Sequence, residues 1–270
     1  MPQERLYRTE AIVLRQMDYG EADRILTLLT PGGKRSAIAK GVRRATSRKA
    51  GHLGLFTRSN LLVATGRNLD VITQAEAAES FEALHGDLMR FTYACYAAEL
   101  VERFAQEDDD DEGALFGLLL SLLRWLVIES DLALGVRHFE LRLLRAAGYA
   151  PELFACLGCG KQIAAETNYF ALEQGGLYCA ACGPAQGSTR PVSVNAQKVL
   201  RYLSTHGLDD LRTLRLLPAT HAEVETLLFD YVEQVVEREV KSATFLQRLR
   251  QDLRRLAERG EEESSGGSHR

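Results

Sequence analysis

Several motifs that would mark this 270-residue chain as an enzyme are missing from it. There is no Gly-x-x-x-x-Gly-Lys-Ser/Thr segment to hold the phosphates of a nucleotide, and no Gly-x-Ser-x-Gly segment to carry a nucleophilic serine. The Gly-Gly-Lys sequence at residues 32–34 is too short to form a nucleotide cradle. No other residues combine into a recognisable catalytic set. We therefore expect the chain not to be an enzyme and to have no small-molecule substrate.

Long apolar segments are also absent. The most apolar stretch, residues 115–128, is too short to cross a bilayer and contains Arg124, so we expect a buried helix there. The chain shows no secretory signal. We expect a protein without membrane contact, located in the cytoplasm.

Cysteine is scarce, and four of the five cysteines form two Cys-x-x-Cys pairs separated by 19 residues. These residues are Cys156, Cys159, Cys179 and Cys182. This spacing is typical of a site in which four thiolates hold one zinc ion. Two disulfides or four buried thiols are the alternatives, and the absence of a secretory signal disfavours disulfides. Gly160 and Gly183 follow the two pairs and can adopt the positive φ that favours such turns.

A site with four cysteine ligands is closed, so we expect this zinc ion to be structural and not catalytic. The His-x-Glu and Pro-Cys-x-x-Cys arrangement of zinc deaminases is not matched, because Ala155 precedes the first pair. The fifth cysteine, Cys95, lies on an apolar helical face and is interpreted as a core residue.

Acidic residues are missing from residues 33–58, although the whole chain has a net charge of −4. Residues 1–75 have a balance of +7 and the remainder a balance of −11, which suggests that the first part meets a polyanion. The acid-free segment holds eight cations: Lys34, Arg35, Lys40, Arg43, Arg44, Arg48, Lys49 and Arg58. A solvated face is one reading of such a run, and a groove that binds phosphates is the one we favour. Phe56, Tyr7 and Tyr19 are candidate base-stacking rings, with core or edge packing as the alternative.

Short runs rich in Ile, Val, Leu and Thr predict five strands, at residues 10–15, 24–30, 35–40, 60–65 and 69–74. Five strands in about 70 residues suit a small barrel of the OB type, and an SH3-like barrel has a similar rhythm. From residue 81 apolar residues recur at helical spacing, beginning with Phe81, Leu84 and Leu88. Further helices are predicted over residues 114–129, 131–147 and 193–205, with Asp131 placed to help the second begin and Ser193 to cap the third. A Thr220-x-x-Glu223 capping box should open a long helix through residue 240, and Ser242 should start another.

The predicted fold class is α+β, with a five-stranded OB-fold barrel followed by an all-α helical domain that carries an inserted four-cysteine zinc module. The expected limits are residues 1–80 for the barrel, 81–260 for the helical domain and 151–190 for the module. Residues 107–112 form an acidic block, read as an exposed loop, and residues 261–270 a polar tail that is expected to be disordered.

The order of these features resembles the RecO family of bacterial DNA repair and recombination proteins. The similar segments are residues 7–15 (YRTEAIVLR), 18–30 (DYGEADRILTLLT), 33–44 (GKRSAIAKGVRR), 47–53 (SRKAGHL) and 67–76 (RNLDVITQAE). The cysteine pairs around 168–179 (NYFALEQGGLYC) and the segment 241–249 (KSATFLQRL) continue the resemblance, which covers residues 5 to about 250.

The resemblance implies a non-enzymatic mediator of DNA repair and homologous recombination, of the RecF-pathway type. Members of this family bind single- and double-stranded DNA and anneal complementary strands. They work with RecR and single-strand-binding protein to help a recombinase load. An RNA-binding or translation-linked module built from the same barrel and zinc ribbon is the alternative, because charge alone does not separate DNA from RNA.

Overall fold

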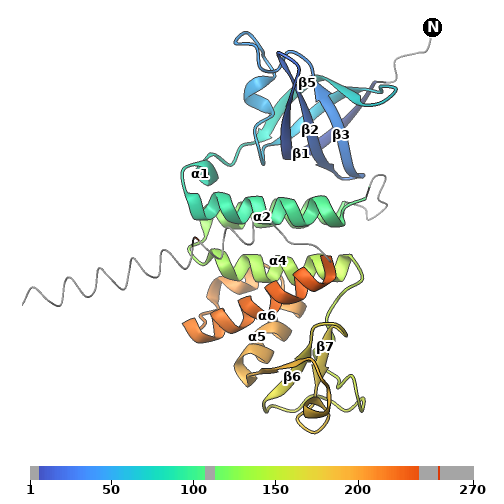
Figure 1. Ribbon diagram of the computed structural model, residues 1–270. Helices are drawn as coiled ribbons and strands as arrows, with labels where there is room; N and C mark the ends of the chain where they lie inside the picture. The colour runs from blue at the N-terminus through green and yellow to red at the C-terminus, as the bar shows by residue number, and fades with distance from the viewer. Residues whose placement is uncertain (1–5, 107–112, 237–248, 250–270) are drawn as a thin grey trace, which may run out of the picture.

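In the computed structural model, which describes residues 6–106, 113–236 and 249, a layer of helices lies between a β-barrel and a small β-sheet (Figure 1). The barrel is formed by the N-terminal part of the chain, and the sheet, formed by the segment that contains the cysteine pairs, lies at the opposite end of the molecule. The fold class predicted from the sequence is therefore confirmed.

Five strands form the barrel: β1 (Leu6–Tyr19), β2 (Asp23–Thr30), β3 (Gly33–Ala39), β4 (Arg58–Ala64) and β5 (Asp70–Glu79). They close in the order β1-β2-β3-β5-β4, with β4 returning to pair with β1 and a short parallel contact between β3 and β5. The order is that of a five-stranded Greek-key barrel, so the OB type is confirmed over the SH3-like alternative. The long β3–β4 connection contains only one short 3-10 turn, η1 (Ala50–His52).

The side chains of β1 alternate between the two faces of the strand, so this strand contributes to two apolar cores. Ala11 and Val13 point into the barrel, whereas Ile12 and Leu14 belong to the larger apolar cluster shared with the helices. The register with β2 shifts between Val13 and Arg15, a bulge that re-aims the rest of the strand. The barrel is therefore packed on the helices through its own first strand.

The helices are α1 (Glu82–His85), α2 (Leu88–Phe104), α3 (Ala114–Ile128), α4 (Leu132–Ala146), α5 (Val194–Thr205) and α6 (Pro218–Val236), with the 3-10 turn η3 (Asp209–Thr213) before α6. Two predicted N-caps are confirmed. The Asp131 carboxylate accepts a hydrogen bond from the Leu134 N–H at 3.0 Å, and the Ser193 hydroxyl accepts one from the Ala196 N–H at 3.2 Å.

The apolar face predicted from Phe81 onward is divided between two helices. The chain breaks at Gly86, and the Asp87 carboxylate accepts hydrogen bonds from the N–H groups of Met89 and Arg90, so a new helix begins there. Leu88 consequently lies at the exposed start of α2, and its assignment to the buried face is wrong. The N-cap at Asp87, and not the spacing of the apolar residues, therefore decides where this helix begins.

The capping box predicted for the long C-terminal helix is also wrong. Helix α6 begins two residues earlier, at Pro218, and Thr220 is buried within its first turn. The Glu223 carboxylate instead accepts hydrogen bonds from the N–H and the hydroxyl of Ser193, at 2.7 and 2.6 Å. A contact between α6 and the start of α5 therefore replaces the local cap.

The segment around the cysteine pairs contains strands that the sequence analysis did not predict. These are β6 (Asn168–Ala171), β7 (Gly176–Tyr178) and β8 (Thr189–Val192), paired in the order β7-β6-β8, with the 3-10 turn η2 (Gly183–Ala185) between β7 and β8. They are only three or four residues long, which is too short for a clear alternation pattern.

Some predictions fall outside the described residues. They concern the acidic block at 107–112, the end of the helix predicted through residue 240, the helix from Ser242 and the tail at 261–270. The domain limits at residues 80 and 260 stay predictions. Within the described part of the chain, no helix is both long and apolar enough to cross a membrane.

Candidate metal centre and nucleic-acid surface

The four cysteines of the two pairs meet at one point. Their sulfur atoms all lie within 4.8 Å of one another, and the sulfurs of Cys159 and Cys179 are 3.9 Å apart. Four sulfurs bound tetrahedrally at about 2.3 Å from one zinc ion would be separated by about 3.8 Å. The cluster could therefore hold a metal ion, and the all-thiolate donor set suits zinc.

The two glycines that follow the cysteine pairs have different roles. Gly160 has a φ of 71°, as the tight-turn argument predicted. Gly183 is not among the residues with positive φ, so that part of the prediction is wrong. A Cβ atom at Gly183 would lie 2.3 Å from the Tyr169 ring, so this position requires glycine because the ring approaches closely.

Two of the four cysteine thiols have shifted pKa values, and the shifts are in opposite directions. Burial opposes ionisation of Cys156, but backbone N–H groups of Cys179, Cys159 and Gly158 outweigh it and lower the pKa of this thiol to about 6. Hydrogen bonds to Cys179 and Cys159 raise the pKa of Cys182 to about 12. The pKa values of these two thiols are thus shifted in opposite directions, and the positive charge of a bound dication would favour the thiolate form of both.

The cysteine module is fixed to the helices by a buried polar network. The Asn168 amide donates to the Gln197 side chain of α5 at 2.9 Å, and Gln197 donates to the backbone oxygens of Glu166 and Val192. The Phe170 and Tyr231 rings meet edge to face, 5.4 Å apart. The module and helices α5 and α6 therefore form one packed unit.

The eight cations of the acid-free segment differ in exposure and in the contacts that they make. Lys40, Arg43, Arg44 and Arg48 are exposed on the first part of the β3–β4 connection. Arg43 donates to the Gly20 backbone oxygen at 3.3 Å and lies 3.4 Å from the Asp18 carboxylate. Within the described residues, the side chains of Lys40, Arg44 and Arg48 have no ion pair.

Lys34, Lys49 and Arg58 make polar contacts within the protein. The Lys34 ammonium donates to the Glu102 backbone oxygen at 2.7 Å, and the Lys49 ammonium donates to the Ile72 backbone oxygen at 2.9 Å. Burial lowers the pKa of Lys49. Arg58 pairs with Glu10 at 2.9 Å, so these cations hold the protein together. Arg35 is half-buried on β3.

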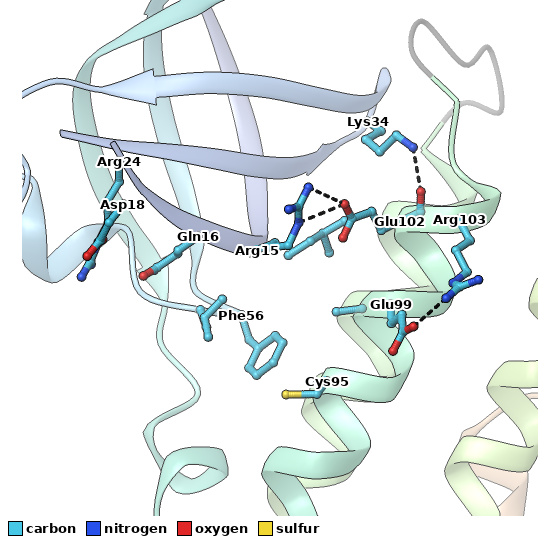
Figure 2. A pocket seen from close by; sticks show the side chains of 13 residues that line it. Arg15, Gln16, Asp18, Arg24, Lys34, Phe56, Cys95, Glu99, Glu102 and Arg103 are labelled. Carbon is cyan, nitrogen blue, oxygen red and sulfur yellow. Dashed lines mark hydrogen bonds and ion pairs between the residues drawn. The ribbon is translucent and has the colours of Figure 1, made fainter. Parts of the chain in front are cut away.

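Figure 2 shows the groove between the barrel and α2, a cavity of about 950 Å³, where Lys34 and Arg15 both point toward Glu102. The Arg15 guanidinium lies 2.9 Å from the Glu102 carboxylate, and Arg103 pairs with Glu99 at 2.8 Å within α2. The charges around the groove are thus largely neutralised by one another.

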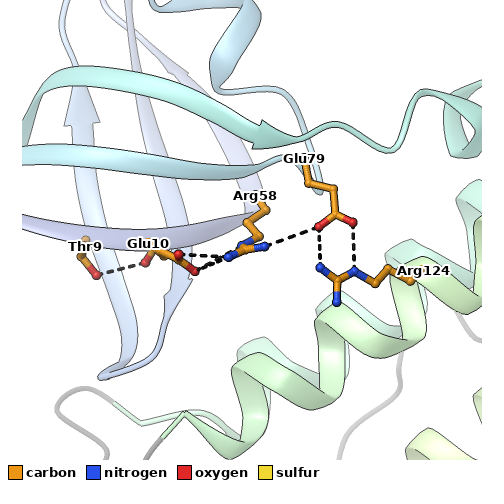
Figure 3. Close-up of polar contacts among 5 residues, drawn as sticks. All are labelled: Thr9, Glu10, Arg58, Glu79 and Arg124. Carbon is orange, nitrogen blue, oxygen red and sulfur yellow. Dashed lines mark hydrogen bonds and ion pairs between the residues drawn. The ribbon is translucent and has the colours of Figure 1, made fainter.

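A second charged contact joins the barrel to α3 (Figure 3). Glu79, the last residue of β5, receives two hydrogen bonds from Arg124, both at 2.9 Å, and lies 3.6 Å from Arg58. The hydrogen bond from Arg124, followed by the charges of Arg124 and Arg58, outweighs burial and lowers the pKa of Glu79. No sequence signal reveals these partners, because 45 residues separate Glu79 from Arg124.

The three candidate stacking rings have different environments. Phe56 is only 1% exposed and packs on the Phe91 ring at 5.6 Å, so its reading as a core residue is confirmed. Tyr7 is half-buried, and its hydroxyl donates to the Asp70 carboxylate. Tyr19, at the end of β1, is 54% exposed and leaves its ring accessible to solvent.

Comparisons with known proteins agree over most of the chain. Residues 3–81 match the family model described as "Recombination protein O N terminal", and residues 85–244 match "Recombination protein O C terminal". The chain is similar to the DNA repair protein RecO of Roseiflexus sp. (strain RS-1), with 44% identity over 93% of this chain and 88% of the relative. It is 43% identical to the DNA repair protein RecO of Desulforudis audaxviator (strain MP104C), over 90% of this chain and 97% of that one.

Proposed function

The chain belongs to the RecO family of DNA repair and recombination proteins, and on that premise we propose that it is a non-enzymatic mediator that binds single- and double-stranded DNA and anneals complementary strands. In the same proposal it acts with RecR and single-strand-binding protein when a recombinase is loaded onto single strands.

The observation that supports DNA binding is the set of exposed cations on the β3–β4 connection. Lys40, Arg44 and Arg48 have no ion pair in the described part of the chain, and residues 33–58 contain no carboxylate to compete for them. Exposed arginine and lysine side chains bind phosphates without regard to base sequence, and they release condensed counterions as they do so. Neutralising the phosphates of two strands also lowers their mutual repulsion, which is the physical requirement for annealing.

The test compares two double variants that remove the same charge from different places. Arg44→Ala with Arg48→Ala removes two of the exposed loop cations. Arg145→Ala with Lys198→Ala removes two exposed cations from α4 and α5, in the helical layer. We expect the loop variant to reduce the slope of log affinity against log salt by about 1.4, since each phosphate contact on a single strand contributes about 0.7. It should also slow strand annealing, and the helical variant should do neither.

Equal behaviour of the two variants would contradict the proposed surface, because the binding would then follow net charge and not the loop. A matched RNA strand in the same titration distinguishes the RNA-binding alternative: tighter RNA binding would contradict the DNA assignment.

We also propose that Cys156, Cys159, Cys179 and Cys182 bind one structural zinc ion. The sulfur separations support this, since all four sulfurs lie within 4.8 Å of one another and the 3.9 Å between Cys159 and Cys179 is close to the tetrahedral value. The ion would fix the turns of the cysteine module. Four thiolates would fill its tetrahedral coordination and leave no open position for a substrate.

A further inference from the structure

A row of apolar side chains crosses the outer face of the barrel. Met17 lies directly opposite Ile25 on β2, Ile25 opposite Ile38 on β3, and Ile38 opposite Val71 on β5. Leu26, Ala37 and Ile72, the chain neighbours of the last three, all belong to the interior core of the barrel. Because side chains alternate along a strand, the row points away from that interior core. Met17 is its exposed end, Ile25 and Val71 are half-buried, and Ile38 is buried. We call Met17, Ile25, Ile38 and Val71 the outer strip.

Tyr19 extends the exposed end of this strip. It lies two residues beyond Met17 on β1, so the two side chains share a face and their Cα atoms are roughly 7 Å apart. Met17 is 49% exposed and Tyr19 54%. Among the described residues of the barrel, the other large apolar side chain with comparable exposure is Leu6, at the opposite end of β1.

The cationic loop begins beside this end of the strip. Tyr19 lies opposite Asp23 on β2, and the Asp23 carboxylate accepts a hydrogen bond from the Gly41 N–H at 2.7 Å. The Arg43 N–H donates to the Ala22 backbone oxygen at 2.9 Å. The β1–β2 turn and the loop that carries Lys40, Arg44 and Arg48 are therefore joined, which places exposed cations next to exposed apolar side chains.

We propose that Met17, Tyr19 and Ile25 form a base-stacking face for single-stranded DNA, with the neighbouring loop cations binding its phosphates. The inference deepens the proposed function and rests on it. A single strand offers the two chemistries that this surface complements, namely the flat faces of unpaired bases and a continuous negative charge. A duplex hides its base faces inside the stack, so it meets only the cations. The strip thus gives the protein a preference for unpaired DNA that is independent of base sequence.

This arrangement divides binding into two separable parts. The loop cations govern the salt dependence and act on single strands and duplexes alike. Tyr19 and Met17 contribute a part that requires an exposed base and does not change the number of phosphate contacts. Substitution of Tyr19 should therefore change the ratio of single-strand to duplex affinity while the salt slope stays the same.

The experiment measures the affinities of Tyr19→Ala and Leu6→Ala for a fluorescent single strand, its duplex and a strand of abasic sites. We expect Tyr19→Ala to weaken binding of the single strand about 5- to 150-fold. Binding of the duplex and of the abasic strand should be unchanged. Leu6→Ala removes an equally exposed apolar side chain from the far end of the same strand and should behave as wild type.

Tyr19→Trp keeps an aromatic ring and adds a direct readout. Its single-strand affinity should match that of the wild type, and its emission should be quenched by the natural strand but not by the abasic one. Trp125 is 4% exposed and provides a constant background. Equal losses for single strand and duplex in Tyr19→Ala, or an unquenched Tyr19→Trp, would overturn the stacking face.

The outcome is separable from that of the proposed function. If Arg44→Ala with Arg48→Ala weakens both forms of DNA while Tyr19→Ala changes neither, the phosphate surface stands and the stacking face is wrong. If only Tyr19→Ala has an effect, selective for the single strand, the stacking face stands and the loop assignment is wrong.

Discussion

At the scale of single residues, the five cysteines have two contrasting environments. Cys95 lies on α2 beside the barrel, where burial, followed by the charge of Glu99, raises the pKa of its thiol to about 11. A thiol of this kind stays protonated and is a poor metal ligand. The other four sulfurs meet within 4.8 Å, and backbone N–H groups favour the thiolate of Cys156.

Replacing one clustered cysteine should therefore differ from replacing the isolated one. We expect Cys179→Ser to lose the bound zinc and to unfold at a lower temperature, since the binding free energy of a structural zinc ion stabilises the fold directly. Cys95→Ser should retain one zinc ion per chain. Elemental analysis and thermal unfolding of protein purified without chelator provide the measurement. Retention of zinc by Cys179→Ser, or its absence from the wild type, would contradict a four-cysteine site.

At the scale of elements, two glycines inside helices illustrate how packing overrules intrinsic helix propensity. Gly117 lies on the exposed face of α3, and a Cβ atom added there would meet no other atom within 4 Å. Gly135 lies inside α4, where a Cβ atom would be 2.3 Å from Cδ1 of Trp125. That indole is fixed, because its N–H donates to the Asp131 backbone oxygen at 2.9 Å.

The same substitution should consequently have opposite effects at the two positions. Gly117→Ala should raise the free energy of unfolding by about 0.5–1 kcal/mol, because alanine is the better helix former. Gly135→Ala should lower it by about 1–3 kcal/mol, because the ring has no room to move. Urea unfolding of both variants checks this. A stabilised Gly135→Ala protein would show that α3 and α4 can separate more easily than their packing indicates.

Some helix boundaries depend on neighbouring residues and others on contacts with distant parts of the chain. Asp131 and Ser193 cap their own helices, so their roles are readable from neighbouring residues. Glu223 looks like the end of a capping box but bonds to Ser193, 30 residues away. Its actual role depends on how α6 packs against α5.

At the scale of the whole molecule, two charged contacts hold the barrel on the helices. Arg15 and Lys34 meet Glu102 of α2 on one side, and Arg124 of α3 meets Glu79 on the other (Figures 2 and 3). The apolar core continues between them, since Phe56 packs on Phe91 of α2. The barrel therefore has a defined orientation toward the helices.

Removing one of these contacts should loosen that orientation more than it destabilises the fold. We expect Arg124→Ala to change the free energy of unfolding by less than about 1 kcal/mol, because the arginine side chain is half exposed. Cleavage by a protease between β5 and α2 should nevertheless become faster than in wild type. Arg145→Ala, which removes an exposed arginine from α4, serves as the control.

High salt provides an independent check of the same contact. Salt screens exposed charges, so cleavage of the wild type should accelerate toward the rate of Arg124→Ala as the salt concentration rises, while the variant should respond less. Equal responses of the two proteins would show that Arg124 does not hold the barrel.

The sequence by itself determined the features whose causes are local. The spacing of the cysteine pairs brings four thiols together through two turns, and alternating or helical apolar patterns place the five strands and most helices. Capping at Asp131 and Ser193 is local in the same sense. Short strands such as β7 were missed because three residues are too few to show a period.

Only the tertiary structure decided which of the eight cations remain available. Lys34 and Glu102 are 68 residues apart, and Arg58 and Glu10 are 48 apart, so neither pairing leaves a periodic trace in the sequence. These contacts form when the barrel closes and packs on the helices. They occupy Lys34 and Arg58, which the sequence alone does not distinguish from Arg44 and Arg48. The outer strip likewise exists only through the register of four strands, because residues distant in the chain become neighbours when the barrel closes.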